Sequence, residues 1–199
     1  MPFNTPNDAT YDLLMNRRSV KAKDMVGPGP DRSAMEKILA AGMRVPDHGK
    51  LNPWRFLVLT GADREKLGDL IAEGLVIEDE RDPKVAEKMK GYASQGPVLV
   101  VAIMCINPDH KIPVMEQELS IGAACQNMLV AATALGYASQ WLTGWAAYSK
   151  TVSDGLGLGE NEKIAGFLFF GNQDRDPSER PRPDINDHIT WSFPESKEA

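Results

Sequence analysis

An arginine pair followed by a serine and a lysine is the first group of residues whose chemistry suggests a ligand. The group consists of Arg17, Arg18, Ser19 and Lys21. Arginine forms forked, charge-assisted hydrogen bonds with phosphate, and a serine hydroxyl adds another donor. The segment therefore predicts a phosphate-binding site. A solvated helix end is the alternative, because cations also suit the C-terminus of a helix.

A second candidate is the segment from Pro46 to Trp54, which contains Asp47, His48 and Asn52. These three polar side chains could hydrogen-bond the edge of a heteroaromatic ring, while proline and tryptophan would supply an apolar wall. Two prolines and a glycine leave no room for a regular element here. The alternative is an ordinary surface loop in which Trp54 anchors the following strand.

Two further segments could contact a ligand. Trp141 and Trp145 stand around a turn at Gly144, and together they could flank a flat molecule, although aromatic packing is the commoner role. Arg180 and Arg182 lie in a proline-rich arm, where residues two apart share a face of an extended chain. They could close over a phosphate, or they could belong to a solvated tail.

Other patterns do not form a site. The glycines between 155 and 159 lack a dinucleotide fingerprint, because Glu160 stands where the last glycine is needed. The three histidines have no metal-ligand spacing, so we expect no metal. Cys105 and Cys125 lie in apolar segments. They imply no disulfide framework, fit a reducing compartment, and do not favour a Cys–His nucleophilic site.

Composition narrows the class of protein. The chain has 199 residues, of which 42% are hydrophobic, and a formal net charge of −6. We expect one domain over residues 1–199, with an extended C-terminal arm from about residue 172. The acidic balance argues against nucleic-acid and membrane-surface partners. There is no signal peptide pattern and no apolar run long enough to span a bilayer, so a cytoplasmic protein is expected.

Helical and strand patterns interleave irregularly, which predicts an α+β fold with a central sheet between helices. We expect helices over residues 8–17, 62–75, 116–135 and 149–156, and a further helix from an N-cap at Asp31 to Met43. Strands are expected over residues 54–60, 97–106, 137–142 and 164–170. The charged stretch 78–90 is predicted to start helical, break at Pro83 and resume. Gly136 is a suitable residue to follow the long helix.

The helix over 116–135 has almost no polar face after its first turn. A helix that is apolar all round is buried on all sides. In a chain of this size, such burial often needs a partner subunit, so we favour a helix at a dimer interface. The alternative is the central helix of a monomeric core.

Several segments, taken in order, form a pattern that extends over nearly the whole chain. They are Asn16-Arg17-Arg18-Ser19, Ala41-Gly42-Met43-Arg44-Val45-Pro46-Asp47-His48, Asn52-Pro53-Trp54-Arg55-Phe56, His110-Lys111-Ile112-Pro113, Glu116-Gln117-Glu118, Gln126-Asn127-Met128 and Gly166-Phe167-Leu168. This ordered set resembles the FMN-dependent nitroreductase family, above all its short NAD(P)H nitroreductase members.

The resemblance implies a nitroreductase-like fold with a mostly antiparallel sheet, and a homodimer with two FMN sites at the subunit interface. In one subunit, it assigns the FMN phosphate and ribityl region to Arg17, Arg18 and Ser19, and the pyrimidine side of the flavin to Lys21. From the other subunit it adds Arg44, Pro46, Asp47 and His48. The backbone of Trp141, Leu142 and Thr143 would lie beside the flavin ring, and Arg180 and Arg182 would complete the phosphate site.

Three positions depart from the family pattern. Lys50 stands where many members have a flavin-contacting asparagine, and Asn52, itself a candidate cofactor contact, stands where glutamine is usual. Leu142 replaces a polar residue found in some short relatives. We expect these changes to affect substrate preference more than FMN binding.

The implied activity is FMN-dependent transfer of electrons from NADH or NADPH to a nitroaromatic, quinone or similar small acceptor, by a ping-pong hydride mechanism. The flavin carries the hydride chemistry, so no catalytic side chain is expected. The alternatives are a flavoenzyme of the same fold with another reaction, such as dehydrogenation, dehalogenation or flavin fragmentation, an FMN-binding protein without turnover, and a hydrolase that uses cysteine or histidine.

Overall fold

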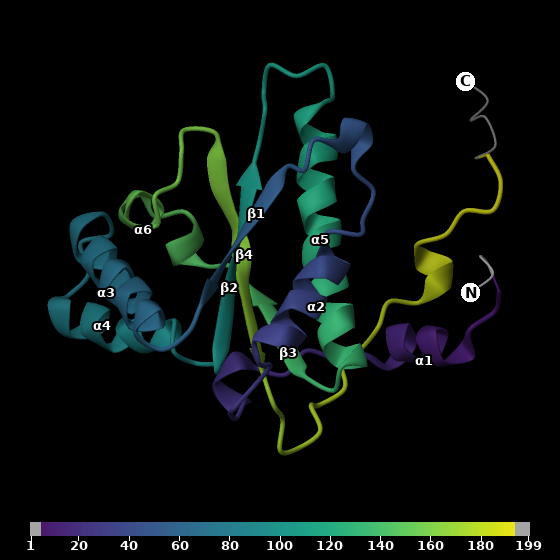
Figure 1. Ribbon diagram of the computed structural model, residues 1–199, viewed down its shortest axis with the longest axis horizontal. Helices are drawn as coiled ribbons and strands as arrows, with labels where there is room; N and C mark the ends of the chain where they lie inside the picture. The colour runs from purple at the N-terminus through teal and green to yellow at the C-terminus, as the bar shows by residue number, and fades with distance from the viewer. Residues whose placement is uncertain (1–4, 194–199) are drawn as a thin grey trace.

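The computed structural model describes residues 5–193. Within that range four strands form one sheet, in the order β1 (Trp54–Leu59), β2 (Val98–Cys105), β4 (Glu162–Gly171) and β3 (Ala138–Leu142). Each neighbouring pair in this order is antiparallel. The predicted α+β fold, with a mostly antiparallel sheet flanked by helices, is confirmed (Figure 1).

The two central strands of the sheet are apolar on both faces. Along β2, the side chains of Leu99 and Val101 join one core cluster, whereas those of Val100 and Ala102 join the other. Strand β4 alternates in the same way. Because successive side chains of a strand point to opposite faces, this sheet has to be covered on both sides.

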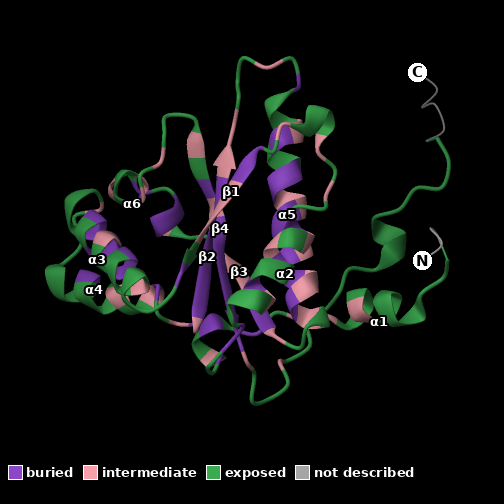
Figure 2. Cartoon of the chain, viewed as in Figure 1, coloured by how far each residue is buried: buried purple, intermediate pink, exposed green. Residues whose placement is uncertain are grey.

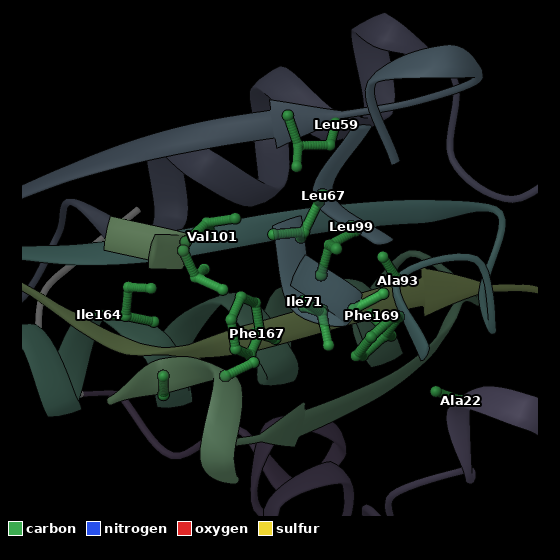
Figure 3. Close-up of a cluster of buried hydrophobic side chains, with 14 of the residues drawn as sticks. Ala22, Leu59, Leu67, Ile71, Ala93, Leu99, Val101, Ile164, Phe167 and Phe169 are labelled. Carbon is green, nitrogen blue, oxygen red and sulfur yellow. The ribbon is translucent and has the colours of Figure 1, made fainter. Parts of the chain in front are cut away.

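Helices cover each face of the sheet (Figures 1 and 2). One layer contains α3 (Ala62–Ile77), α4 (Pro83–Met89) and α6 (Lys150–Gly155), and the other contains α2 (Arg32–Gly42) and α5 (Val114–Ala134), with α1 (Asp8–Asn16) beside α5. Short 3-10 helices are η1 (Ala22–Asp24), η2 (His48–Lys50), η3 (Lys90–Tyr92), η4 (Trp145–Ala147) and η5 (Ile185–Asp187). Figure 3 shows the first core, where Leu67 and Ile71 of α3 gather with Leu99, Phe167 and Phe169 of the sheet.

Helix α5 is covered on one side only. Ile121, Cys125 and Met128 are buried, whereas Met115 and Leu119 on the other side of the helix are 65% and 64% exposed. The described part of the chain therefore does not enclose the helix on all sides. An apolar face of α5 remains open to a partner.

Two helix-end signals are confirmed. The Asp31 carboxylate accepts a hydrogen bond from the backbone N–H of Ala34 at 2.8 Å, as an N-cap does. Gly136, just after α5, has a φ of 82°. That left-handed conformation lets the chain turn back toward β3 without a Cβ clash.

Two other expectations are wrong. Pro83 does not break a helix but begins α4, because the first turn of a helix does not need the N–H that proline lacks. The segment Pro46–Pro53 is not free of regular structure, since η2 lies within it. Gly49 and Lys50, with φ values of 69° and 56°, make the tight turn possible.

Glu78 joins the end of α3 to the start of α6. Its carboxylate accepts hydrogen bonds from the backbone N–H of Thr151 at 2.6 Å and of Lys150 at 3.1 Å, and from the Ser149 hydroxyl at 3.0 Å. The hydrogen bonds from Thr151 first, and then those from Ser149 and Lys150, lower the pKa of Glu78 to about 2. The contact holds the segment that leads from β3 into α6.

Gly166 of β4 makes room for the indole of Trp141 on β3. A Cβ at this position would overlap with Trp141 Nε1 and would lie 2.9 Å from the carbonyl oxygen of Leu142. The same indole N–H donates a hydrogen bond to the carbonyl of Ala165 at 3.2 Å. The glycine thus allows the two strands to pair with Trp141 folded over them.

Substitution Gly166→Ala should lower the free energy of unfolding by about 3 kcal/mol, because Trp141 must move or β3 must separate from β4. Urea denaturation followed by tryptophan fluorescence measures this loss. The matched control is Gly91→Ala, where a Cβ would meet no described atom within 4 Å. An equal loss in both variants would contradict the role of Gly166.

Candidate functional site

The end of α1 places two arginines at a small cavity. Arg17 and Arg18 line a cavity of about 190 Å³ between α1, the end of α5 and the start of the C-terminal arm. Arg17 Nη1 is buried and has no hydrogen-bond partner among residues 5–193. A buried guanidinium nitrogen without a partner is costly, so its presence indicates a site for an anion.

The C-terminal arm brings a third arginine to the same place. Burial first, and then the charge of Arg182, lower the pKa of Arg17. Arg182 also donates to the carboxylate of Glu179 at 3.3 Å, and Arg18 forms an ion pair with that carboxylate at 3.5 Å. The predicted meeting of the early arginines with Arg182 is thus found in the fold. Arg180 is exposed, and of its donors only the backbone N–H contacts Glu179, at 2.8 Å.

The chain between Arg18 and η1 runs along the free edge of β3. The backbone N–H of Val20 donates to the carbonyl of Ser139 at 3.2 Å, and that of Ala22 donates to the side-chain oxygen of Gln140 at 2.6 Å. Ser19 and Lys21, on either side of Val20, are exposed. This pairing sets the predicted phosphate segment beside the strand that carries Trp141 to Thr143.

The side chain of Trp141 takes part in aromatic core packing, the commoner of the two roles considered for it. Its indole is half-buried and packs against the core on the α5 side of the sheet. Leu142 packs against the opposite core. Thr143 is exposed, and its carbonyl accepts a hydrogen bond from the Tyr92 hydroxyl at 3.0 Å. What this segment can offer a ligand is therefore its backbone and the Thr143 side chain.

The loop that follows α2 is held by its own backbone and by α5. The two carboxylate oxygens of Asp47 accept the backbone N–H groups of Leu51 at 3.1 Å and Asn52 at 3.0 Å. His48 Nδ1 lies 2.7 Å from a carboxylate oxygen of Glu116. Asp47 thus shapes the loop, whereas the imidazole of His48 is held at the open face of α5.

Two more contacts from α5 reach the same loop. The side-chain amide of Asn127 donates to the carbonyl of Arg44 at 3.1 Å, and the Ser120 hydroxyl donates to the carbonyl of Pro46 at 2.5 Å. Pro46, His48 and the exposed face of α5 line a second cavity of about 350 Å³.

The two groups of candidate residues lie far apart in one chain. In Figure 1, α1 is at the lower end of α5, and the loop at 44–52 is near its upper end. The loop contacts Ser120, and the arginine cavity includes Thr133. Thirteen helical positions separate these two residues, which corresponds to about 20 Å.

Glu179 and Gln140 are polar contacts that the sequence patterns did not single out, and Asn127 stood there only as part of the segment Gln126-Asn127-Met128. Glu179 stands next to Arg180 within an arginine-containing arm, and an acid between cations is a signal that could have suggested an ion pair. Gln140 and Asn127 carry no such signal, because each contacts the backbone of a segment remote in sequence.

The thiols give no support to a nucleophilic cysteine. Burial is the main cause that raises the pKa of Cys105 to about 11 and that of Cys125 to about 12. Both side chains therefore stay protonated at neutral pH. Among residues 5–193, no cluster of His, Cys, Asp and Glu could hold a metal ion. None of the described helices is long and apolar enough to cross a membrane.

Comparison with known proteins gives matches over most of the chain. The model of the "Nitroreductase family" matches residues 14–172. The "Putative NAD(P)H nitroreductase YdjA" of Escherichia coli K12 is 35% identical over 160 residues, which cover 80% of this chain and 86% of that protein.

Solved structures share the fold. A nitroreductase-like family protein from Bacillus cereus superposes with a TM-score of 0.82 at 23% identity, over 98% of this chain and 100% of that one. The FMN and NADPH-dependent nitroreductase NfnB from "sphigopyxis sp. strain HMH" superposes with a TM-score of 0.73 at 23% identity, over 92% and 98% of the two chains.

Replacing Arg17 should show whether this half-buried arginine serves stability or ligand binding. Arg17→Met is expected to leave the free energy of unfolding unchanged or to raise it by up to about 1 kcal/mol, because it removes a buried charge whose Nη1 has no partner. The variant should also lose the stabilisation that phosphate ions give the wild type. Urea denaturation with and without phosphate measures both effects.

The control is Arg81→Met, which removes an exposed arginine paired with Asp79 at 2.6 Å. It should leave the phosphate effect intact. A loss of more than about 1 kcal/mol in Arg17→Met would mean that Arg17 serves the fold rather than a ligand.

Proposed function

The chain belongs to the nitroreductase family, and on that premise we propose that it is an FMN-dependent oxidoreductase, which passes electrons from NADH or NADPH to small organic acceptors. The observation that carries the proposal is the arginine cluster with its unpartnered, buried Arg17 Nη1. A phosphate monoester supplies the oxygen acceptors and the negative charge that this nitrogen lacks. The residues present therefore fit the phosphate of FMN.

In this proposal, Arg17, Arg18 and Ser19 bind the phosphate and ribityl region, and Arg182 adds a further cation from the arm. Arg180 is proposed to join them, since the residue is exposed and its backbone N–H contacts Glu179. The half-buried Arg17 and the three other arginines would hold the phosphate from several directions.

Lys21 is proposed to lie at the pyrimidine side of the flavin, where its ammonium would stabilise negative charge on the reduced ring. The segment Trp141–Thr143 would run beside the ring and offer backbone donors. Tyr92 supports this arrangement, because its hydroxyl holds the carbonyl of Thr143 at 3.0 Å. Burial raises the pKa of Tyr92 to about 12, so the hydroxyl remains a donor at neutral pH.

FMN held by these residues would supply the hydride chemistry between the nicotinamide and the acceptor, and we propose that the two substrates use one place in turn. The protein contributes binding, orientation and charge rather than a catalytic side chain. We propose nitroaromatics, quinones or similar small organic molecules as acceptors. The NfnB relative is described as FMN and NADPH-dependent.

We further propose that the protein is a homodimer in which Arg44, Pro46, Asp47, His48 and Asn52 of one chain complete the flavin site of the other. The open apolar face of α5, with Met115 and Leu119, would form the interface. The distance between the two groups of residues in one chain supports this arrangement. We place such a dimer in the cytoplasm. Each chain would form a single FMN-binding domain over residues 1–199, with an arm from about residue 172. Residues 1–4 and 194–199 of that domain lie outside the described residues.

The test of the activity is direct. Purified protein should be yellow, release FMN on denaturation, and oxidise NADH or NADPH in the presence of a nitro or quinone acceptor. Arg18→Ala should weaken FMN binding about ten- to hundredfold, because it removes a charged hydrogen-bond donor from the phosphate. Flavin fluorescence titration measures the affinity, and Arg32→Ala, an exposed arginine on α2, is the control. A protein that binds no flavin would sink the proposal.

The test of the dimer uses the open face of α5. Leu119→Glu should give a monomer in analytical ultracentrifugation and should abolish FMN binding although Arg17, Arg18 and Ser19 are intact, since a charge would be buried in an apolar interface. Ile77→Glu is the matched control, because Ile77 is 65% exposed on α3, away from α5. Full FMN binding by a monomeric Leu119→Glu variant would refute the shared site.

A further inference from the structure

We propose that Glu179 competes with phosphate for the arginines, and so determines how strongly the site prefers a phosphorylated flavin over one without phosphate. The carboxylate of Glu179 makes the contacts with Arg18 and Arg182 that a phosphate monoester needs. The identity of the ligand as FMN rests on the proposed function. The competition between carboxylate and phosphate does not, because it follows from the charges around the cavity.

The geometry of Glu179 is that of a bridging anion. One carboxylate oxygen lies 3.5 Å from Arg18 Nη1, and the other accepts from Arg182 Nη2 at 3.3 Å. The second oxygen also accepts the backbone N–H of Arg180 at 2.8 Å. The hydrogen bond from the Arg180 N–H first, and then the charges of Arg18 and Arg182, lower the pKa of Glu179. Both oxygens of the carboxylate are thus engaged by the same cluster.

The pairing leaves positive charge uncompensated. Arg17, Arg18 and Arg182 face one paired carboxylate, and Arg17 Nη1 has no partner in the described chain. Asp176 also lines the cavity, but it forms no ion pair with the described residues. With Glu179 in place and Asp176 counted, the arginines exceed the carboxylates by one, and once Glu179 is displaced they exceed Asp176 by two. A phosphate monoester, which carries close to two negative charges, matches the charge left after that displacement better than a carboxylate does.

A phosphate and Glu179 compete for one nitrogen of Arg18. Arg18 Nη1 already donates to the carbonyl of Pro177 at 3.2 Å, besides its ion pair with Glu179. Both partners belong to the arm, so a phosphate gains this nitrogen when the segment 177–179 moves. The side chain of Glu179 is 63% exposed. Its carboxylate can therefore return to water at small cost.

The experiment compares Glu179→Gln with the wild type. We expect Glu179→Gln to bind FMN about three- to tenfold more tightly, since the competing ion pairs are exposed and individually weak. Its affinity for riboflavin, which has no phosphate, should not change. Glu36→Gln removes the same charge from an exposed pair with Arg32 and should leave both affinities as in the wild type.

Three outcomes of this titration would overturn the proposal. FMN affinity that is unchanged or weaker in Glu179→Gln would mean that the carboxylate organises the arginines for the ligand. An equal gain for riboflavin would place the effect away from the phosphate. An equal gain in FMN affinity in Glu36→Gln would mean that the effect comes from the overall charge of the protein.

A second measurement does not need flavin. Inorganic phosphate should raise the melting temperature of Glu179→Gln more than that of the wild type, compared at equal ionic strength in chloride. This result would support the competition even if the protein bound no FMN, which would refute only the proposed function. An equal or smaller phosphate effect in Glu179→Gln would refute the competition itself.

Discussion

The pairing of β2 with β4 is the interaction on which the rest of the structure depends. The two strands pair from Val98 with Phe170 to Cys105 with Glu162, and most of their residues are buried. Because both faces of this ladder are apolar, helices must pack on each side of it. Helix α5 covers one face with its own buried side and leaves an apolar side outward. The helix that completes the hydrophobic core therefore also presents an apolar surface suited to a second chain.

The arginine cluster follows a different physical rule. Burying a guanidinium nitrogen without a partner works against folding, and the fold tolerates this at Nη1 of the half-buried Arg17, while the arm supplies one bridging carboxylate. A site that is incompletely neutralised by its own residues retains affinity for an external anion. Stability given up at such a place is regained on binding, which is the usual compromise at functional sites.

Helix α5 also sets the spacing of the candidate site. It contacts the His48 loop near its start and contributes Thr133 to the arginine cavity near its end. A helix of 21 residues cannot shorten to bring these groups together. A second copy related by a two-fold axis can bring these groups together, because the two copies then contribute opposite ends of their α5 helices to one site. The proposed function and the proposed dimer thus depend on one geometric constraint.

The sequence by itself determined the features that depend on near neighbours. The continuous apolar run of β2, the cap at Asp31, the turn at Gly136 and the apolar character of α5 follow from local residue order, and the fold class follows from them. Only the tertiary structure decided that Trp141 packs inward over Gly166 and that Glu179 reaches Arg18. The physical reason is that such contacts join residues remote along the chain, and their partners are set by how strands and helices pack.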